Sequence, residues 1–363
     1  IHTKIGDNPE MTDDIKISQI SNISYPDDSN DIENKYGKKG LENIFSIRNG
    51  EYSYKNPDLP ILDSKHIKNY SSKFHDIIQN VKNSDGIVYI YSYWVEGTII
   101  PLMLALEHEG YIHRSKKSFL NYDKKKKLTS HNTFIVLTSD TNLSKNNSDD
   151  VKALTNESNK YGEDVKIVIG SLISSEGIDM KYIREIHVVD PWHHLNRLEQ
   201  IVGRGIRYCS HEGLEEIDGY SRKNVTIYLH VATLPDKRES IDELMYRRAE
   251  EKNVDIGEIE TLLKINSIDC QLFKYLNVIG KNDVKSLRLI SSQGIKIIEK
   301  PYDKPYSKVC SYRSKCDYIC NGKTSKTLKK TMSTFNNRVG KKYISNYSKI
   351  SKKFIYIQKY VYN

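Results

Sequence analysis

Short apolar segments alternate with amphipathic ones between His66 and Ala232, and this alternation is the main structural signal in the chain. The apolar segments are rich in Val, Ile and Tyr and have the length of ordinary strands. They are GIVYIYS (86–92), TFIVLTSD (133–140), VKIVIGS (165–171), REIHVVD (184–190) and NVTIYLHVA (224–232). The pattern predicts an α/β fold with a parallel sheet covered by helices on both faces. Ligands of such sheets bind at the carboxyl ends of the strands.

The remaining parts of the chain lack this alternation. Residues 1–65 are polar and rich in turn-forming residues, so we expect a linker or a remnant of an upstream region. The sheet domain is expected over 66–235. A helical extension is expected over 236–300, because the strand pattern stops after Thr233. Residues 301–363 hold a cysteine cluster followed by a basic tail.

The segment NRLEQIVGRGIRYCSH (196–211) predicts an amphipathic helix with an unusual polar face. Gln200, Arg204 and Arg207 are four and three residues apart, which places them on one narrow face of a helix. The residues expected on the opposite, buried face are Leu195, Leu198, Val202 and Ile206. Gly203 borders the polar face and would let a ligand or another backbone approach. The alternative is a surface helix with solvated arginines, but a face rich in planar donors favours an anion site.

The net charge of +9 is unevenly distributed. From Asn321 to Asn363 there are eleven Lys or Arg residues and no acidic residue, so the rest of the chain carries a net charge of −2. Aromatic residues are interleaved with the lysines, and this combination is typical of segments that bind single-stranded nucleic acid. A genome rich in A and T would produce the same composition without any function.

The chain shows no sign of secretion or of membrane insertion. Its first residues are polar, and its longest apolar run, IIPLMLAL (99–106), is too short to span a bilayer. It begins with Ile1, so we expect a fragment or a processed product. The five cysteines fit an intracellular protein with free thiols better than a disulfide scaffold.

Three segments resemble motifs IV, V and VI of superfamily 2 helicases: GIVYIYS, IVIGSLISSEGIDM and LEQIVGRGIRYCSH. They occur in the order and the approximate spacing of the second, C-terminal RecA-like lobe. QIVGRGIR fits the pattern Q-x-x-G-R-x-x-R, and SEGID fits the glycine and aspartate of motif V. DPWHHLNRLEQIVGRGIRYCSH, IDELMYRRAEEK and SIDC are similar to helicases of large DNA viruses, of the poxvirus early transcription factor and nucleoside triphosphate phosphohydrolase type.

The resemblance implies roles for individual residues. Arg207 and Arg204 would be the arginine finger and its phosphate-sensing partner, and Gln200 would couple the nucleotide to the position of the lobe. The residues implied to lie by the nucleotide are Gly177, Asp179 and Gly203, with Asp179 near the ribose or orienting an arginine. The residues implied to offer hydroxyls or amides to nucleic-acid phosphates are Ser92, Thr138 and Ser171. Each of these loop residues could instead have an ordinary role in a turn.

Other candidate motifs are weaker. A complete motor needs a phosphate-cradling loop, G-x-x-x-x-G-K-[ST], but the single GKT (322–324) lacks the first glycine and follows no strand. The acidic DELM (242–245) opens a helix, where acids suit the helix dipole. Cys310, Cys316 and Cys320 lack the paired CxxC spacing of zinc sites, so free thiols are favoured over zinc bound with Cys270 as a distant fourth ligand. His193 and His194, which follow Trp192, are expected to line a cleft.

Two hypotheses follow. The first is the second motor lobe of a viral nucleic-acid-dependent ATPase or helicase acting in transcription, which would use ATP and Mg only together with an upstream lobe that this sequence lacks. The alternative is a non-catalytic nucleic-acid-binding module with a helicase-like fold. The expected partners are nucleic acid (DNA rather than RNA), the upstream helicase lobe and viral transcription machinery, without a membrane. The expected location is the host cytoplasm or the virion.

Overall fold

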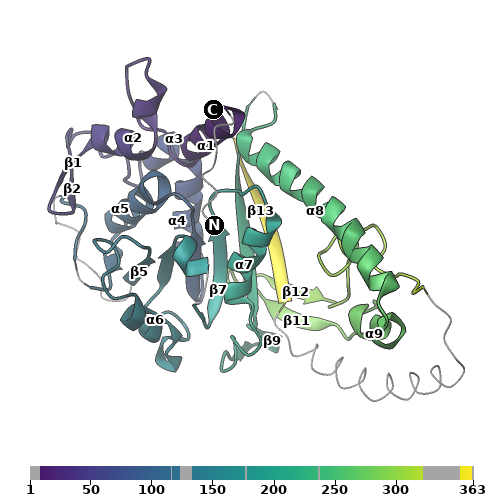
Figure 1. The fold of residues 1–363 in the computed structure, drawn as a ribbon. Coiled ribbons are helices and arrows are strands. Elements are labelled where there is room, and N and C mark those ends of the chain that lie inside the picture. The colour runs from purple at the N-terminus through teal and green to yellow at the C-terminus, as the bar shows by residue number, and fades with distance from the viewer. Residues whose placement is uncertain are drawn as a thin grey trace, which may run out of the picture.

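The computed structural model describes residues 9–115, 117–122, 133–175, 178–235, 238–321 and 352–361. Within this part of the chain the main element is a seven-stranded parallel sheet, with the order β13-β10-β7-β3-β6-β5-β4 (Figure 1). Its strands are β3 (Ile87–Tyr91), β4 (Ile112–His113), β5 (Thr133–Leu137), β6 (Ile167–Gly170), β7 (Ile183–Val188), β10 (Asn224–Thr233) and β13 (Lys352–Val361). The α/β class and the five predicted strands are confirmed.

Helices cover both faces of this sheet. The helices of the sheet domain are α3 (Ile67–Tyr70), α4 (Ser72–Asn83), α5 (Ile100–His108) after a π-helical turn (Val95–Ile99), α6 (Asn147–Thr155), α7 (Leu195–Gly205) and the short 3₁₀ helices Glu157–Asn159 and Leu172–Ser175. Successive residues of one strand enter different cores: Val88 and Ile90 pack with α4 and α5, whereas Ile87 and Tyr89 pack against α7. Burial on both faces explains why these strands are apolar throughout.

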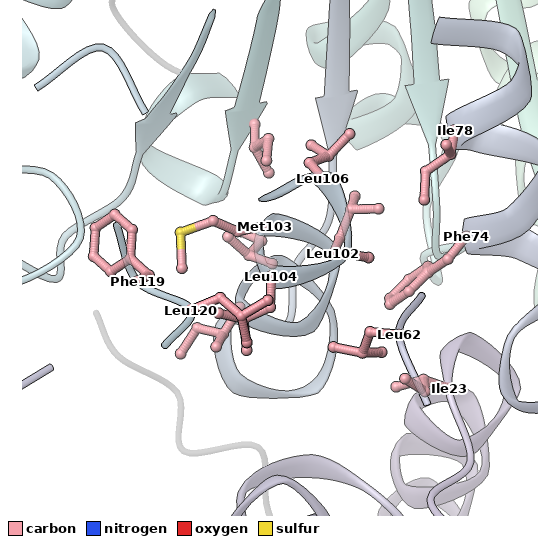
Figure 2. Close-up of a cluster of buried hydrophobic side chains, with 14 of the residues drawn as sticks. Ile23, Leu62, Phe74, Ile78, Leu102, Met103, Leu104, Leu106, Phe119 and Leu120 are labelled. Atoms are coloured by element: carbon pink, nitrogen blue, oxygen red, sulfur yellow. The ribbon is translucent and has the colours of Figure 1, made fainter. Parts of the chain in front are cut away.

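The described part of residues 1–65 is structured, so the prediction of a linker is wrong there. It contains α1 (Pro9–Asn22), a 3₁₀ helix (Ile32–Lys35), α2 (Gly37–Ile44) and an antiparallel pair, β1 (Phe45–Arg48) and β2 (Glu51–Tyr54). Ile23, Ile61 and Leu62 are fully buried in the same core as α4 and α5. Figure 2 shows Ile23 and Leu62 beside Phe74 of α4. Ile23 stands singly among polar residues, and Ile61 and Leu62 belong to one short apolar stretch, so no periodic pattern reveals them.

The helical extension is confirmed, but strands continue beyond Thr233. The helix α8 (Ile241–Asn266) runs away from the sheet (Figure 1) and is followed by α9 (Cys270–Asn277). Beyond them, β11 (Leu287–Ile290) and β12 (Lys296–Glu299) form a small sheet with β8 (Glu216–Ile217) and β9 (Tyr220–Ser221). The strand β13 comes from the predicted basic tail and lies parallel to β10 at the sheet edge. The rest of that tail, 322–351 and 362–363, lies outside the described residues.

The clustered cysteines form disulfides, which corrects the expectation of free thiols. Cys270 is bonded to Cys320, and Cys310 to Cys316, with Cα–Cα distances of 5.8 and 4.3 Å. A zinc site at Cys310, Cys316 and Cys320 is therefore not what the structure shows, and the described residues contain no cluster of His, Cys, Asp or Glu suited to a metal. The pairing of Cys270 with Cys320 depends on the chain folding back along α8 and α9, which spacing alone cannot reveal. None of the described helices combines the length and apolar character needed to cross a bilayer.

A buried ion pair joins the ends of several elements. Lys73 of α4 and Asp242 of α8 lie 2.6 Å apart, and both side chains are fully buried. Lys73 Nζ also donates to Asn22 Oδ1 and to the carbonyl of Val189, at 2.9 and 3.1 Å. Asp242 accepts the amide of Ala232 at 2.8 Å. Asp242 therefore does more than complement a helix dipole: it ties α8 to the sheet.

Helix α7 lies against β7 through a glycine, but not through the one singled out from the sequence. A Cβ atom on Gly205 would lie 2.8 Å from Ile186 Cδ1 and 3.3 Å from Ile183 Cβ, so any side chain would push the helix away from the strand. A Cβ atom on Gly203 would have no such neighbour within 4 Å. Gly205 permits the packing, and Gly203 faces open space.

We expect Gly205→Ala to lower the free energy of unfolding by about 1–3 kcal/mol, because it overpacks the contact with β7. Gly203→Ala should leave it unchanged or raise it by up to about 1 kcal/mol through helix propensity. Urea unfolding of the two variants measures both changes. Equal effects at the two positions would contradict the packing described here.

We expect Lys73→Met to lower the free energy of unfolding by about 3–5 kcal/mol, because it leaves the Asp242 carboxylate buried without its counter-charge. The double variant Lys73→Met, Asp242→Asn should recover part of that loss, since it removes the uncompensated charge. Chemical unfolding of the single and double variants tests this. A single variant within about 1 kcal/mol of the parent would show that the pair contributes little.

Candidate nucleotide site

The predicted arginine face is divided between a helix and the turn that follows it. Gln200 and Arg204 lie on α7, exposed and half-buried respectively, but α7 ends at Gly205. Arg207 is exposed in the turn after the helix, so the prediction of a single helical face is wrong for this residue. The buried side of α7 is as predicted at Val202, and Ile201 is buried with it.

The two arginines contact consecutive residues of the motif V segment. Arg204 Nη1 donates to the carbonyl of Ile178 at 2.9 Å. Arg207 Nη1 donates to Asp179 Oδ1 at 2.8 Å, and the two side chains are 43% and 61% exposed. An exposed ion pair of this kind contributes at most about 1 kcal/mol, so a more strongly charged anion could displace the carboxylate. The neighbouring Gly177, also predicted to lie by the nucleotide, falls outside the described residues.

A cavity of about 400 Å³ opens beside this ion pair. Its lining residues are Glu157, Asp179, Lys181, Tyr182, Arg207, Tyr208, Cys209, Ser210, Glu212 and Gly213. The cavity lies between the end of the motif V segment and the turn that carries Arg207. Of these lining residues, the sequence analysis singled out Asp179 and Arg207 as candidates but none of the others, because the cavity forms only when the turn folds back on the start of β7.

Hydrogen bonds attach this turn firmly to the sheet. The amide of Tyr182 donates to the carbonyl of Ser210 at 2.8 Å, and Ser210 Oγ donates to the carbonyl of Arg207 at 2.8 Å. His211 Nε2 lies 2.7 Å from the carbonyl of Ile183, the first residue of β7, so this nitrogen carries the proton. Burial lowers the pKa of His211 to about 4, which keeps the ring neutral at neutral pH.

The residues predicted to contact nucleic-acid phosphates are buried. The exposed fractions of Ser92, Thr138 and Ser171 are 1%, 1% and 5%. Ser92 Oγ donates to Asp190 Oδ1 at 2.5 Å, and the amides of Ser92 and Ser171 bond to the carbonyls of neighbouring strands. The structure therefore contradicts the expectation that these hydroxyls face a ligand. These residues instead make hydrogen bonds within the protein at the ends of the strands.

Aromatic rings lie at the same edge of the main sheet, where its strands have their carboxyl ends. Both tryptophans of the chain, Trp94 and Trp192, follow the neighbouring strands β3 and β7. Tyr93 and Trp192 have ring centroids 4.4 Å apart, and the Arg197 guanidinium lies 3.8 Å from the Trp192 centroid and 5.0 Å from that of Tyr93. Buried Asp190 orients this group by accepting the amide of Tyr93 at 3.0 Å. Both tryptophans follow predicted strands, and this position is the sequence signal from which the aromatic group could have been predicted.

We expect acid to destabilise the turn that carries Arg207. Unfolded, His211 has an ordinary pKa near 6.5, and in the folded chain its pKa is about 4. Between these values the unfolded state binds the extra proton, so stability falls as the pH drops from about 6.5 to about 4, by on the order of 3 kcal/mol for this residue. His211→Gln should flatten the dependence of the unfolding free energy on pH in that window. An unchanged slope would contradict a buried neutral imidazole.

Known proteins that resemble this chain include helicases of large DNA viruses. No family model matches the sequence. A protein of Acanthamoeba polyphaga mimivirus provisionally named an ATP-dependent RNA helicase is 32% identical over 269 residues, which is 73% of this chain and 41% of that protein. A protein of Invertebrate iridescent virus 3 provisionally named a helicase is 28% identical over 72% of this chain and 26% of that protein. A homologue of termination factor NPH-I in African swine fever virus is 29% identical over 56% of this chain and 33% of that protein.

The chain thus spans less than half the length of these relatives. Among solved structures, the C-terminal part of the Fun30 ATPase domain aligns with 49% of this chain and 45% of that chain, at 16% identity and a TM-score of 0.32. So loose a superposition adds nothing to the fold established above. Over about three quarters of its length, this chain resembles the helicases of large DNA viruses, as its motifs indicate.

Proposed function

We propose that this chain is the second motor lobe of a viral nucleic-acid-dependent ATPase, and that Arg207 is its arginine finger. The observation that carries the proposal is that Arg204 and Arg207 converge on consecutive residues, Ile178 and Asp179. Two guanidiniums at one loop supply planar donors for a polyanion. Negative charge grows on the transferred phosphoryl group during hydrolysis, and a guanidinium contributes most where that charge appears.

The exposure of the arginine–aspartate pair supports this role. A guanidinium committed to the fold would be buried and would bond to several acceptors, as Arg184 does. Arg207 has one carboxylate partner among the described contacts, and the pair is open to solvent. Gln200 lies exposed on α7, and Gly203 leaves space beside it for an approaching group. ATP and Mg would be held mainly by an upstream lobe, and this chain would supply charge stabilisation.

We further propose that nucleic acid crosses the strand ends at Tyr93, Trp192 and Arg197. Rings that pack on one another at a sheet edge, with a guanidinium beside them, can bind both bases and phosphates. The relatives include a protein named for RNA helicase activity, so nothing favours DNA over RNA. A role in viral transcription is suggested by the relative named as a termination factor homologue.

The alternative is a binding module without catalysis, and the ion pair between Arg207 and Asp179 is the observation that favours it. In such a module the arginine would serve only to fasten the motif V segment. Removal of either partner would then have the same small effect on stability, and removal of Arg207 would have no particular effect on turnover.

In the full-length protein we expect Arg207→Ala to lower ATP turnover by about 10³–10⁵-fold, with little change in ATP affinity, because the finger acts on charge that develops in the transition state. Arg207→Lys should restore little, since an ammonium cannot reproduce the planar donor pair. Steady-state ATPase assays with and without nucleic acid measure both effects.

Two further variants serve as controls. Arg247→Ala removes an exposed arginine of α8 that pairs with Glu239, just before the helix, and with Glu251; it lies outside the cavity lining and should leave turnover unchanged. Asp179→Ala removes the carboxylate partner alone. Near-normal turnover in Arg207→Ala, matching that of Arg247→Ala, would establish a structural role for Arg207 and favour the binding module.

A further inference from the structure

A short loop closed by a disulfide bond contacts both helix α7 and helix α8. The loop comprises residues 306–316, and we call it the brace loop. The disulfide between Cys310 and Cys316 closes it. Within it, the amide of Tyr306 donates to the carbonyl of Arg313 at 2.8 Å. The shape of the brace loop is therefore set largely by its own bonds.

The brace loop lies against α8 at a glycine. A Cβ atom on Gly257 would lie 2.0 Å from the carbonyl oxygen of Ser311, so no other residue permits this approach. Glycine is unfavourable inside a helix, and the contact explains its presence within the 26 residues of α8. Ser311 Oγ also accepts from Lys264 Nζ at 2.6 Å and donates to Glu260 Oε2 at 3.1 Å. The brace loop is thus fastened to α8 by its backbone and by a side chain.

The next residue, Tyr312, extends the contact to α7. Its hydroxyl donates to Glu199 Oε1 of α7 at 2.9 Å and accepts a hydrogen bond from Asn253, a buried residue of α8. Lys308 of the brace loop forms an ion pair with the same Glu199 carboxylate. One carboxylate of α7 is therefore held from two positions of the brace loop. It belongs to the helix that carries Gln200 and Arg204.

The backbone of the brace loop is strained where it contacts the helices. Tyr306, Ser311 and Tyr312 have φ angles of 58°, 51° and 54°, in the left-handed region that non-glycine residues rarely adopt. Such conformations persist only where the surrounding structure imposes them, and they are found most often at functional sites. Two of the three strained residues are the ones that contact α8 and α7. The disulfide is the covalent bond that keeps this segment closed.

We propose that the brace loop positions α7 in the motor lobe, and that its disulfide controls this contact. With the disulfide closed, Tyr312 holds Glu199 and so fixes the angle at which α7 presents Gln200 and Arg204. Once the disulfide is reduced, the strained residues relax to ordinary backbone and α7 is released. The inference rests on the proposed function, because the angle of α7 affects turnover only if these two residues act on a nucleotide.

A dithiol is the class of reductant that opens the brace loop. Cys316 is half-buried, whereas Cys270, Cys310 and Cys320 are at most 7% exposed, so attack occurs at the Cys316 sulfur. The first thiolate of the dithiol forms a mixed disulfide with Cys316 and displaces the Cys310 thiolate, which takes up a proton. The second thiolate then attacks the dithiol's own sulfur in the mixed disulfide and releases Cys316. Two electrons pass from the dithiol to the protein, and the dithiol becomes a cyclic disulfide.

Hydrogen exchange measured by mass spectrometry on the 363-residue chain tests the release of α7. We expect dithiothreitol to accelerate exchange of the α7 amides by about tenfold and to leave those of α5 unchanged, because only the helix freed from the brace loop opens more often.

Two pairs of substitutions show which disulfide is responsible. In the double variant Cys310→Ser, Cys316→Ser the α7 amides should exchange rapidly with or without dithiothreitol. In the matched double variant Cys270→Ser, Cys320→Ser they should still respond to it.

A single hydroxyl tests the contact itself. Tyr312→Phe removes the bond to Glu199 and should accelerate exchange of the α7 amides by about threefold. Tyr306→Phe is the control, since Tyr306 lies in the same loop and is 69% exposed, and it should change nothing. In the full-length protein, Tyr312→Phe should lower kcat by about fivefold with KM within about twofold, because α7 presents groups that act mainly in the transition state. Dithiothreitol should lower kcat likewise, and reoxidation should restore it.

Two results would overturn the inference. The first is unchanged exchange of the α7 amides when alkylation shows that Cys310 and Cys316 are reduced. The second is loss of the dithiothreitol response in Cys270→Ser, Cys320→Ser, which would assign the effect to the other disulfide. Exchange is measured without nucleotide, so it does not depend on the arginine finger. Normal turnover of Arg207→Ala would refute the proposed function and leave the exchange result standing, so the two failures are distinguishable.

Discussion

The buried pair of Lys73 and Asp242 is the interaction on which the arrangement of the N-terminal segment, the main sheet and α8 depends. Two charges removed from water are stable only if their attraction and their hydrogen bonds offset the loss of hydration. Both conditions hold here: the ammonium has acceptors in Asn22 and Val189, and the carboxylate accepts the amide of Ala232. The elements that supply these groups cannot separate without exposing an unpaired charge. The N-terminal segment, the sheet and α8 are thus joined at one point.

Arg184 plays the corresponding part at the opposite end of the sheet. Its guanidinium is fully buried and bonds to Asp85 before β3, to the carbonyl of Asn224 in β10 and to the carbonyl of Ile290 in β11. The small sheet that contains β11 is therefore attached to the main sheet by a cation rather than by apolar packing alone. Both ends of the parallel sheet are closed by a buried charge with its acceptors in place, and the exposed Arg207 differs from both.

The sequence predicts those parts of this fold that depend on the pattern of residues within a single segment. Strands such as 86–92 are recognisable because burial on both faces requires an uninterrupted apolar run, and α7 because one of its faces is buried. The N-terminal segment could not be predicted, since Ile23 and Ile61 belong to no periodic apolar pattern and are buried only by tertiary contacts. The disulfide from Cys270 to Cys320 and the pairing of β13 with β10 likewise join residues far apart in the chain.

The candidate site likewise contains residues that motif spacing could single out and contacts that it could not predict. Motif spacing singled out Arg204, Arg207 and Asp179 as candidates. In the structure Arg204 contacts Ile178, and Arg207 contacts the adjacent Asp179. Spacing could not show that Ser92 turns inward, because its hydroxyl bonds to Asp190, which lies 98 residues later. It also could not show where α7 stops.

The end of α7 connects the packing of the molecule to its proposed chemistry. Gly205 brings the helix so close to Ile183 and Ile186 that the last helical turn lies directly on β7. The chain then leaves the helix, and Arg207 is carried by a turn whose bonds run to Tyr182 and Ile183 rather than by the helix itself. A guanidinium held in this way moves with the start of β7, whereas Gln200 and Arg204 move with the helix. A small shift between α7 and β7 would therefore change the spacing of the two arginines, which is the kind of movement that could link a nucleotide to the position of the lobe.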